Sequence, residues 1–194
     1  MRIGIDLDGV LYEYDKTARF MLRHYKGHSE SGPMGAPSTS WNYIQEHIPA
    51  EDWKWLWSEG IALGLFRYGH VVTGSQSAIR DIRSAGNTVI VITHRPSEAV
   101  PDTIAWLDLF QKPEAGVVLD GIHILSSGEP KSSVQADLLI DDKPSNLDDW
   151  IGHGRRGILF DRDHNQGAKP AGSERAYGWH DATRIVKEMM TWGK

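Results

Sequence analysis

Two aspartates near the amino terminus are the residues whose types and spacing most clearly point to chemistry. The largely apolar residues 3–5 lead directly into Asp6 and Asp8, which is the pattern of a short buried strand with acids at its carboxyl end. Strand geometry sends both side chains to one side, so two negative charges lie close together and need a cation or a shared proton. A hard divalent metal with oxygen ligands is the neutraliser we expect. The alternative is that the acids only cap a turn before Gly9. A calcium loop fits less well, because an EF-hand needs three alternating ligands before its glycine.

Polar residues also follow two later apolar runs, at residues 89–92 and 138–140. These polar residues are Thr93, His94, Asp141 and Asp142. Lys131 lies shortly before the second run. Together with the first two aspartates, these residues supply the carboxylates, hydroxyl and amine needed for metal-assisted phosphoryl transfer through an aspartyl ester. Each residue taken singly could be a surface group or a helix cap, so the interpretation depends on the ordered set.

The elements that must position these residues alternate between strands and helices. We predict strands at residues 3–5, 89–92, 121–125, 138–140 and 157–160. We predict helices at residues 12–25, at 75–85, around 104–110, and from Asp181 onward, the last burying Ile185, Met189 and Trp192. This alternation implies an α/β fold with a Rossmann-like parallel sheet and helices on both faces. The polar strand ends would then emerge along one edge of the sheet.

A segment of different composition interrupts this pattern after the first strand. Residues 26–40 are rich in glycine, proline and serine and are typical of a loop. Residues 41–60 hold half of the eight tryptophans and predict one or two short helices. We therefore predict a core made of residues 1–11 and 71–194, and a small helical cap made of residues 12–70. The tryptophans would form the hydrophobic core of this cap or a wall on which a flat ligand stacks.

Composition limits the classes of function. A chain of 194 residues with 40% hydrophobic and 24% charged residues fits one folded domain with an insertion. The absence of cysteine excludes disulfides, thiolate metal sites and a cysteine nucleophile. The net charge of -5 disfavours a long nucleic-acid partner, and no apolar stretch has the length of a membrane span. We expect a cytoplasmic protein with a small-molecule partner and no membrane partner. The oligomeric state stays open, with a homodimer as one option.

The ordered motifs resemble those of the haloacid dehalogenase superfamily of phosphatases. They are Ile-Asp-Leu-Asp-Gly-Val-Leu at residues 5–11, Thr93 after its apolar run, Lys131, and Leu-Leu-Ile-Asp-Asp-Lys at residues 138–143. Within the superfamily the chain is most similar to the 5'(3')-deoxyribonucleotidases. The stretches that carry this similarity are residues 64–66, residues 136–143, and residues 158–160 with His164 and Asn165. The resemblance spans nearly the whole chain, although the insert matches only in position and approximate size.

The resemblance implies a phosphatase that releases phosphate from a nucleoside monophosphate, most closely a deoxyribonucleotide. It suggests Asp6 as the nucleophile and Asp8 as the general acid and base. Thr93 and Lys131 would hold the phosphate. Each group suits its role, because a carboxylate can attack phosphorus and a compact ammonium can neutralise a developing dianion.

The resemblance also implies Mg2+ as the cofactor. Its ligands would be the carboxylate of Asp6, the backbone carbonyl of Asp8 and the carboxylate of Asp142. Asp141 would support these ligands without touching the metal.

The sequence departs from the family pattern at two places. His94, followed by Arg95, stands where these nucleotidases usually have a small hydroxyl residue after the motif threonine. His94 is therefore a candidate phosphate contact, and Arg95 would either bind an anion or pair with one of the acids. The aromatic residues of the insert do not match the family one by one, and Trp41 and Phe66 are the candidate substrate contacts there.

Two alternative functions fit the same residues. The same residues could hydrolyse another small phosphate ester or remove the 3'-phosphate from the ends of nucleic acid. A module resembling a response-regulator receiver, which accepts a phosphoryl group without turnover, is the alternative from another class. Receivers place the acidic pair first along the chain, whereas here the adjacent acids Asp141 and Asp142 come last.

Overall fold

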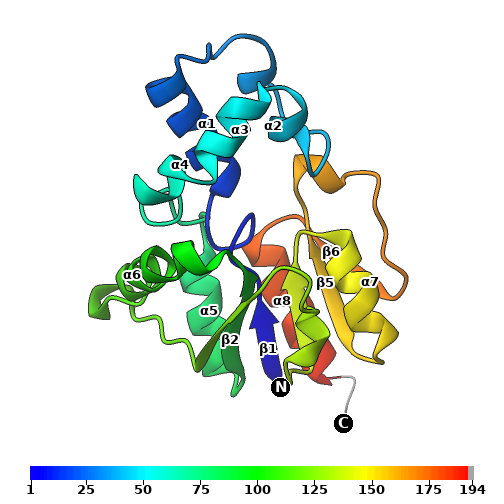
Figure 1. The fold of residues 1–194 in the computed structure, drawn as a ribbon. Helices are drawn as coiled ribbons and strands as arrows, with labels where there is room; N and C mark the ends of the chain where they lie inside the picture. Colours follow the sequence, from blue (N-terminus) through cyan, green and yellow to red (C-terminus); the bar gives the residue numbers. More distant parts are fainter. Residues whose placement is uncertain (192–194) are drawn as a thin grey trace.

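The core of the molecule is a parallel β-sheet, seen in a computed structural model that describes residues 1–191 (Figure 1). Within these residues the sheet has six strands in the order β3-β2-β1-β4-β5-β6. Their bounds are β1 Arg2–Ile5, β2 Thr88–His94, β3 Gly121–Leu125, β4 Leu138–Asp141, β5 Arg156–Phe160 and β6 Ser173–Ala176. Every neighbouring pair is parallel. The α/β fold and the five expected strands are confirmed, and β6 is an additional strand that the sequence did not predict.

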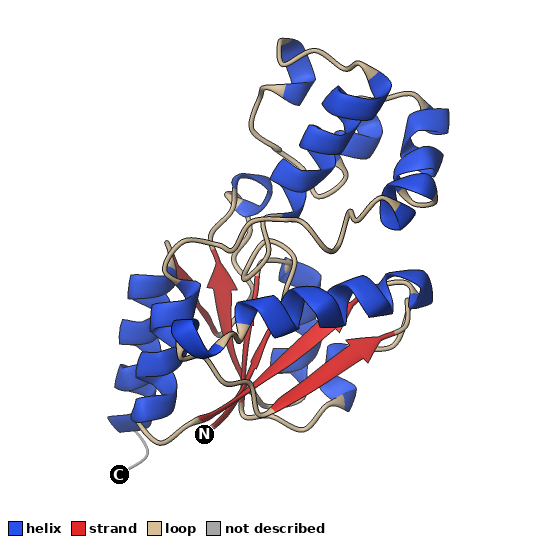
Figure 2. Ribbon diagram, turned by 90° about the vertical axis from the view of Figure 1, so that its left-hand side faces the viewer, coloured by secondary structure: helices blue, strands red, loops and turns tan. Residues whose placement is uncertain are grey.

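Some of the helices cover both faces of this sheet, and the others lie beyond the carboxyl ends of its strands (Figures 1 and 2). The helices are α1 Tyr14–Lys26, α2 Tyr43–Glu46, α3 Ala50–Leu56, α4 Glu59–Ala62, α5 Ser75–Ser84, α6 Val100–Phe110, α7 Pro144–Gly152 and α8 Trp179–Thr191. Short 3-10 turns occupy Gly32–Met34, Ser97–Ala99, Pro113–Ala115, Lys131–Ser133 and Asp163–Asn165. The segment expected to hold one or two helices contains three, α2 to α4. In α8, Ile185 is buried and Met189 partly buried as expected, while Trp192 lies outside the described residues.

The two faces of the sheet have separate hydrophobic cores because strand side chains alternate. In β2, Val89 and Val91 pack into a cluster with residues of α5, α6 and α8, whereas Ile90 and Ile92 pack into a cluster with Trp150 of α7. Full burial of each such side chain contributes roughly 1.5–3 kcal/mol. The continuous apolar runs of the central strands follow from this two-sided burial.

A smaller group of helices lies beyond the carboxyl ends of the strands. Helices α1 to α4 stand over that edge of the sheet in both views (Figures 1 and 2). They share a third hydrophobic cluster, which includes Leu22, Leu56 and Phe66. The division of the chain into a core and a cap at residues 12 and 70 stays a prediction, but this separate cluster is the kind of packing it requires.

The chain passes between the sheet and these helices at two adjacent points. The backbone N–H of Glu13 donates to the carbonyl of His70 at 2.9 Å, and the backbone N–H of Val72 donates to the carbonyl of Leu11 at 2.8 Å. The buried Tyr12 hydroxyl donates to the Leu65 carbonyl at 2.5 Å. The outgoing and returning segments are thereby tied together directly beside the first two acids. Among residues 1–191, no helix is long and apolar enough to cross a membrane.

Candidate active site

Three buried aspartates meet at the carboxyl edge of the sheet. Strands β1 and β4 pair with Ile5 opposite Ile140, so Asp6 and Asp141, one residue further along each strand, become neighbours. Asp142 follows, and one carboxylate oxygen from each of the three acids lies within 4.8 Å of the others. The acids are at most 5% exposed. Such a concentration of buried negative charge requires cations beside it.

Lys131 is one of these cations. Its ammonium lies 2.8 Å from a carboxylate oxygen of Asp6 and 2.7 Å from one of Asp141. Burial alone would lower the pKa of Lys131, but the charges of Asp141 and Asp6 raise that pKa above its ordinary value. Lys131 is therefore fully charged at neutral pH. It lies on the turn Lys131–Ser133 just before β4, which explains how a lysine ten residues from Asp141 reaches the same point.

Asp141 is held on several sides. Besides the contact with Lys131, it accepts hydrogen bonds from the backbone N–H of Lys143 at 2.8 Å and from the side chain of Asn146 at 3.0 Å. Burial raises the pKa of Asp141, and Lys131 opposes that shift. With its oxygens engaged by α7 and Lys131, Asp141 is placed to fix the loop that carries Asp142.

Asp142 has a free buried oxygen. One carboxylate oxygen, Oδ1, has no hydrogen-bond partner within the described residues, although it is fully buried. Burial, followed by the charges of Asp141 and Asp6, raises the pKa of Asp142 well above its ordinary range. The other oxygen touches Gly9, where an added Cβ would lie 1.9 Å from Oδ2 and where the φ of +77° favours glycine. Gly9 is therefore required for the first loop to approach Asp142 this closely.

Asp8 has a different cationic partner. Arg95, at the end of β2, donates from Nε and Nη2 to the two carboxylate oxygens of Asp8, at 3.1 and 2.7 Å. Of the two sequence-based alternatives for Arg95, the structure shows the one in which it pairs with an acid. Asp6 and Asp8 thus each have their own cation, Lys131 and Arg95.

Thr93 and His94 lie at the end of β2 beside these acids. The Thr93 hydroxyl is buried and has no hydrogen-bond partner within residues 1–191. The ring of His94 lies 2.6 Å from the Glu129 carbonyl, and His94 lines the cavity described next. Both residues are therefore close to the acids, while their roles toward phosphate stay predictions.

A cavity of about 350 Å³ lies between the acids and the helices above them. From the sheet side it is lined by Asp8, His94 and Asp142, and from the opposite side by Trp41 and Phe66, which lie in turns beside the upper helices. All five are residues that the sequence singled out. Sequence reasoning missed Tyr14 and Arg162, which also line the cavity, and it considered Trp57 only as one of the tryptophans that could form a wall for a flat ligand. The only signals for them were the high tryptophan content of the segment and the position of Arg162 just after a strand.

Trp41, which lines this cavity, contacts two residues that follow strands of the sheet. The ring of His164 meets that of Trp41 edge to face at a centroid distance of 5.1 Å. The ammonium of Lys143 lies 4.7 Å from the Trp41 ring centroid. His164 also contacts Asp142, and burial lowers the pKa of His164, which favours the neutral imidazole at neutral pH.

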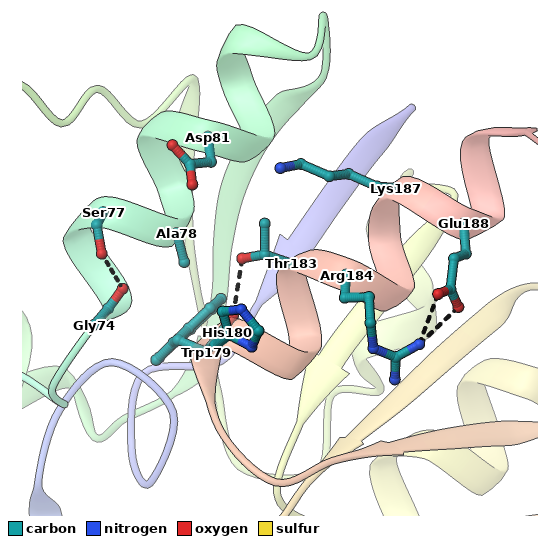
Figure 3. A pocket seen from close by; sticks show the side chains of 10 residues that line it. All are labelled: Gly74, Ser77, Ala78, Asp81, Trp179, His180, Thr183, Arg184, Lys187 and Glu188. Atoms are coloured by element: carbon teal, nitrogen blue, oxygen red, sulfur yellow. Dashed lines mark hydrogen bonds and ion pairs between the residues drawn. The ribbon is translucent and has the colours of Figure 1, made fainter.

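A larger cavity of about 610 Å³ lies elsewhere, between α5 and α8 (Figure 3). The side chains that line it include the exposed Arg184, which pairs with Glu188 on the same helix. None of the predicted site residues lines it. The predicted site residues that line a cavity therefore belong to the smaller one.

Comparison with known proteins agrees with this geometry. A family model described as 5' nucleotidase, deoxy (pyrimidine), cytosolic type C protein matches residues 1–191. The chain belongs to this family. A relative of this nucleotidase in Chlorobaculum tepidum, assigned provisionally as a 5'(3')-deoxyribonucleotidase, is 27% identical over 97% of this chain and 91% of its own. The nucleotidase is thus a hydrolase of phosphate monoesters.

Solved structures show the same fold at low sequence identity. A haloacid dehalogenase-like hydrolase from Xanthomonas campestris superposes with a TM-score of 0.59 at 17% identity, covering 99% of this chain and 96% of its own. D,D-heptose 1,7-bisphosphate phosphatase from B. bronchiseptica, solved with magnesium and phosphate, gives a TM-score of 0.57 at 13% identity, covering 97% and 98%. The fold that the resemblance implied for this nucleotidase is confirmed.

Proposed function

We propose that the protein is a Mg2+-dependent 5'(3')-deoxyribonucleotidase that transfers the phosphate of a nucleoside monophosphate to Asp6 and then to water. One observation carries this proposal. Asp8 and Asp142 line a cavity of nucleotide size whose far wall is aromatic, and behind them Asp6 lies beside Asp142, with the Lys131 ammonium 2.8 Å from Asp6. The family match and the relative's name point to the same substrate class.

The acid cluster fits a divalent metal. Two buried cations contact three of the four acids, Lys131 contacting Asp6 and Asp141 and Arg95 contacting Asp8, whereas neither contacts Asp142. Oδ1 of Asp142 is a buried oxygen that has no partner among the residues the structure describes, and carboxylate oxygen is the atom type that Mg2+ binds. Asp6, the backbone carbonyl of Asp8 and Asp142 would hold the ion. When bound, Mg2+ would withdraw charge from the phosphoryl group and orient it for attack.

The residues around the phosphate have separate roles in the two steps. An oxygen of Asp6 forms a bond to phosphorus while the bond from phosphorus to the nucleoside oxygen breaks. Asp8 gives that leaving oxygen a proton, and in the second step it takes a proton from the water that cleaves the aspartyl phosphate. Lys131 and Thr93 hold phosphoryl oxygens through both steps. Protons and charge balance over the cycle, because Asp8 recovers the proton it gave.

The wall of the cavity supports a flat substrate. Trp41 and Trp57 present aromatic surface to a space suited to a small ligand, and the buried Phe66 lies behind them. We propose that residues 12–70 form a cap that binds the base and the sugar, while residues 1–11 and 71–194 form the core that holds the phosphate. A free nucleotide as substrate agrees with the cytoplasmic location that the sequence predicts.

The test is a panel of phosphate esters assayed with Mg2+ and again with EDTA. The panel includes 5' and 3' nucleoside monophosphates in deoxy and ribo forms, sugar phosphates and p-nitrophenyl phosphate. We expect the highest kcat/KM for a deoxyribonucleotide, loss of activity with EDTA, and no turnover by Asp6→Asn of normal stability. Preference for a sugar phosphate would refute the substrate class. Near-normal activity of Asp6→Asn would refute the nucleophile, and release of only one equivalent of product would indicate a phospho-accepting module.

A further inference from the structure

Arg95 is the most fully enclosed cation beside the site that the mechanism above does not use. Its side chain has no exposed surface. Besides the two bonds to Asp8, its Nη1 donates to the Thr103 hydroxyl of α6 at 3.0 Å. The Thr103 hydroxyl in turn donates to the Ala99 carbonyl at 2.7 Å, so its oxygen is free to accept from Arg95. Each of the three guanidinium nitrogens therefore donates a hydrogen bond.

Aromatic rings hold the guanidinium from the sides. The carbon at its centre lies 4.8 Å from the ring centroid of Tyr12 and 4.5 Å from that of Phe66. Tyr12 belongs to the segment that leaves the sheet, and Phe66 belongs to the hydrophobic cluster of the helices above it. A planar, delocalised cation suits both the stacking and the two parallel bonds to a carboxylate, and a lysine would supply neither.

These contacts decide where the Asp8 carboxylate points. Asp8 is about one-fifth exposed at its side chain and lines the cavity, so without Arg95 its side chain could turn among several rotamers. The bonds from Nε and Nη2 engage both of its oxygens and leave one preferred orientation. The Arg95 side chain is absent from the set that lines the cavity, whereas its neighbour His94 belongs to that set. Arg95 is thus built to contact Asp8 and not the substrate.

We infer that Arg95 is a positioning residue that orients Asp8 for proton transfer to the leaving oxygen. This inference rests on the proposed role of Asp8 as the general acid. In the first step the proton moves from the Asp8 carboxyl to the nucleoside oxygen as the bond from phosphorus to that oxygen breaks and the bond to Asp6 forms. Arg95 neither gains nor loses a proton in this step. Its contribution is to hold the donor within reach, which is a condition for general acid catalysis.

The leaving group distinguishes this role from phosphate binding. A nucleoside leaves as a strongly basic alkoxide and needs a proton, whereas p-nitrophenolate is stable without one. The ratio kcat/KM reports only the steps up to release of the leaving group. For Arg95→Ala we expect kcat/KM to fall roughly 100-fold with the nucleoside monophosphate and less than about tenfold with p-nitrophenyl phosphate. Equal losses on both substrates would overturn the inference, because a phosphate ligand or a purely structural residue would affect both.

Three further measurements complete the test. Guanidinium added at millimolar concentration should restore part of the nucleotide activity of Arg95→Ala and leave wild type unchanged, while Arg95→Lys should keep most of the defect. In an Asp8→Asn background, Arg95→Ala should cause little additional loss, because the two residues act through one step. Additive losses or full activity of Arg95→Lys would contradict the inference. Arg184→Ala is the control with unchanged activity. It removes an exposed arginine that pairs with Asp181 and Glu188 on α8 and does not line the cavity beside Asp8.

A milder variant covers the case in which Arg95→Ala does not fold. Thr103→Val removes the anchor of Nη1 while keeping the shape of a buried side chain. We expect about a fivefold loss with the nucleotide and no loss with p-nitrophenyl phosphate, as for one hydrogen bond. An inactive wild type would refute the proposed function itself. An active wild type in which neither variant changes the ratio between the two substrates would refute only the role of Arg95.

Discussion

Replacing Lys131 by methionine should destabilise the protein as well as inactivate it. The ammonium lies 2.8 Å from Asp6 and 2.7 Å from Asp141, and all three side chains are buried. Methionine has a similar volume but no charge, so the change leaves two buried carboxylates without their cation. Removing one partner of a buried ion pair costs about 3–5 kcal/mol. For a protein of this length that corresponds to a decrease in Tm of about 10–15 °C.

The pH and the metal should both modify this cost. At low pH the buried acids become protonated, and the missing cation matters less, so the difference in free energy of unfolding between variant and wild type should shrink. Millimolar Mg2+ should recover part of the stability, because it supplies positive charge at the same place.

Urea unfolding followed by circular dichroism, at neutral and at acidic pH and with or without Mg2+, measures these effects. Lys187→Met, at an exposed position on α8, is the matched control and should change the free energy of unfolding by less than about 0.5 kcal/mol. A Lys131→Met protein that lost activity but kept its stability within about 1 kcal/mol would contradict the reasoning, since the buried acids would then not depend on this cation.

Further predictions concern the acids and the loop. Asp142→Asn should weaken Mg2+ binding more than Asp141→Asn does, and titration calorimetry showing the reverse order would reject the assignment of ligands. Gly9→Ala should abolish most phosphatase activity, because the added Cβ would lie 1.9 Å from Oδ2 of Asp142. An active variant whose crystal structure shows Asp142 in its original position would disprove this steric argument. Hydrogen bonds from Lys26 lower the pKa of Asp52 from its ordinary 3.8, so the ionised acid stabilises the fold above that pH and loses its effect as the pH falls through the lowered pKa. Asp52→Asn should therefore be less stable than wild type at neutral pH, with the two unfolding curves converging in strong acid.

The sequence predicted the centre of the sheet well. The apolar runs of β1, β2 and β4 are buried on both faces, and polar residues follow each of them, so the pattern identified both the strands and the edge where the acids gather. Strand β6 escaped prediction because it pairs only with β5 at the border of the sheet, and its residues Ser173–Ala176 are mostly polar, with Glu174 exposed. Edge strands of this kind lack the hydrophobic signal on which the prediction depends.

The partners of the acids were harder to predict. That Lys131 reaches Asp6, and Arg95 reaches Asp8, depends on the register between strands that are far apart in the sequence. The tryptophan-rich segment shows a similar limit. Trp53 packs against the hydrophobic cluster of the upper helices and also lines the cavity, so the two roles considered for these rings are combined in one residue. Which ring faces the ligand follows from the packing of short helices, which composition does not specify.

The bonds that join Leu11 to Val72 and Glu13 to His70 have a consequence for how such enzymes diversify. Because the chain departs from the sheet and returns to it at adjacent residues, the intervening segment can be replaced by another of different length without shifting the strand that leads to Asp6. Recombination or insertion at this point would exchange the helices above the sheet in a single event and leave the sheet and its cluster of acids intact.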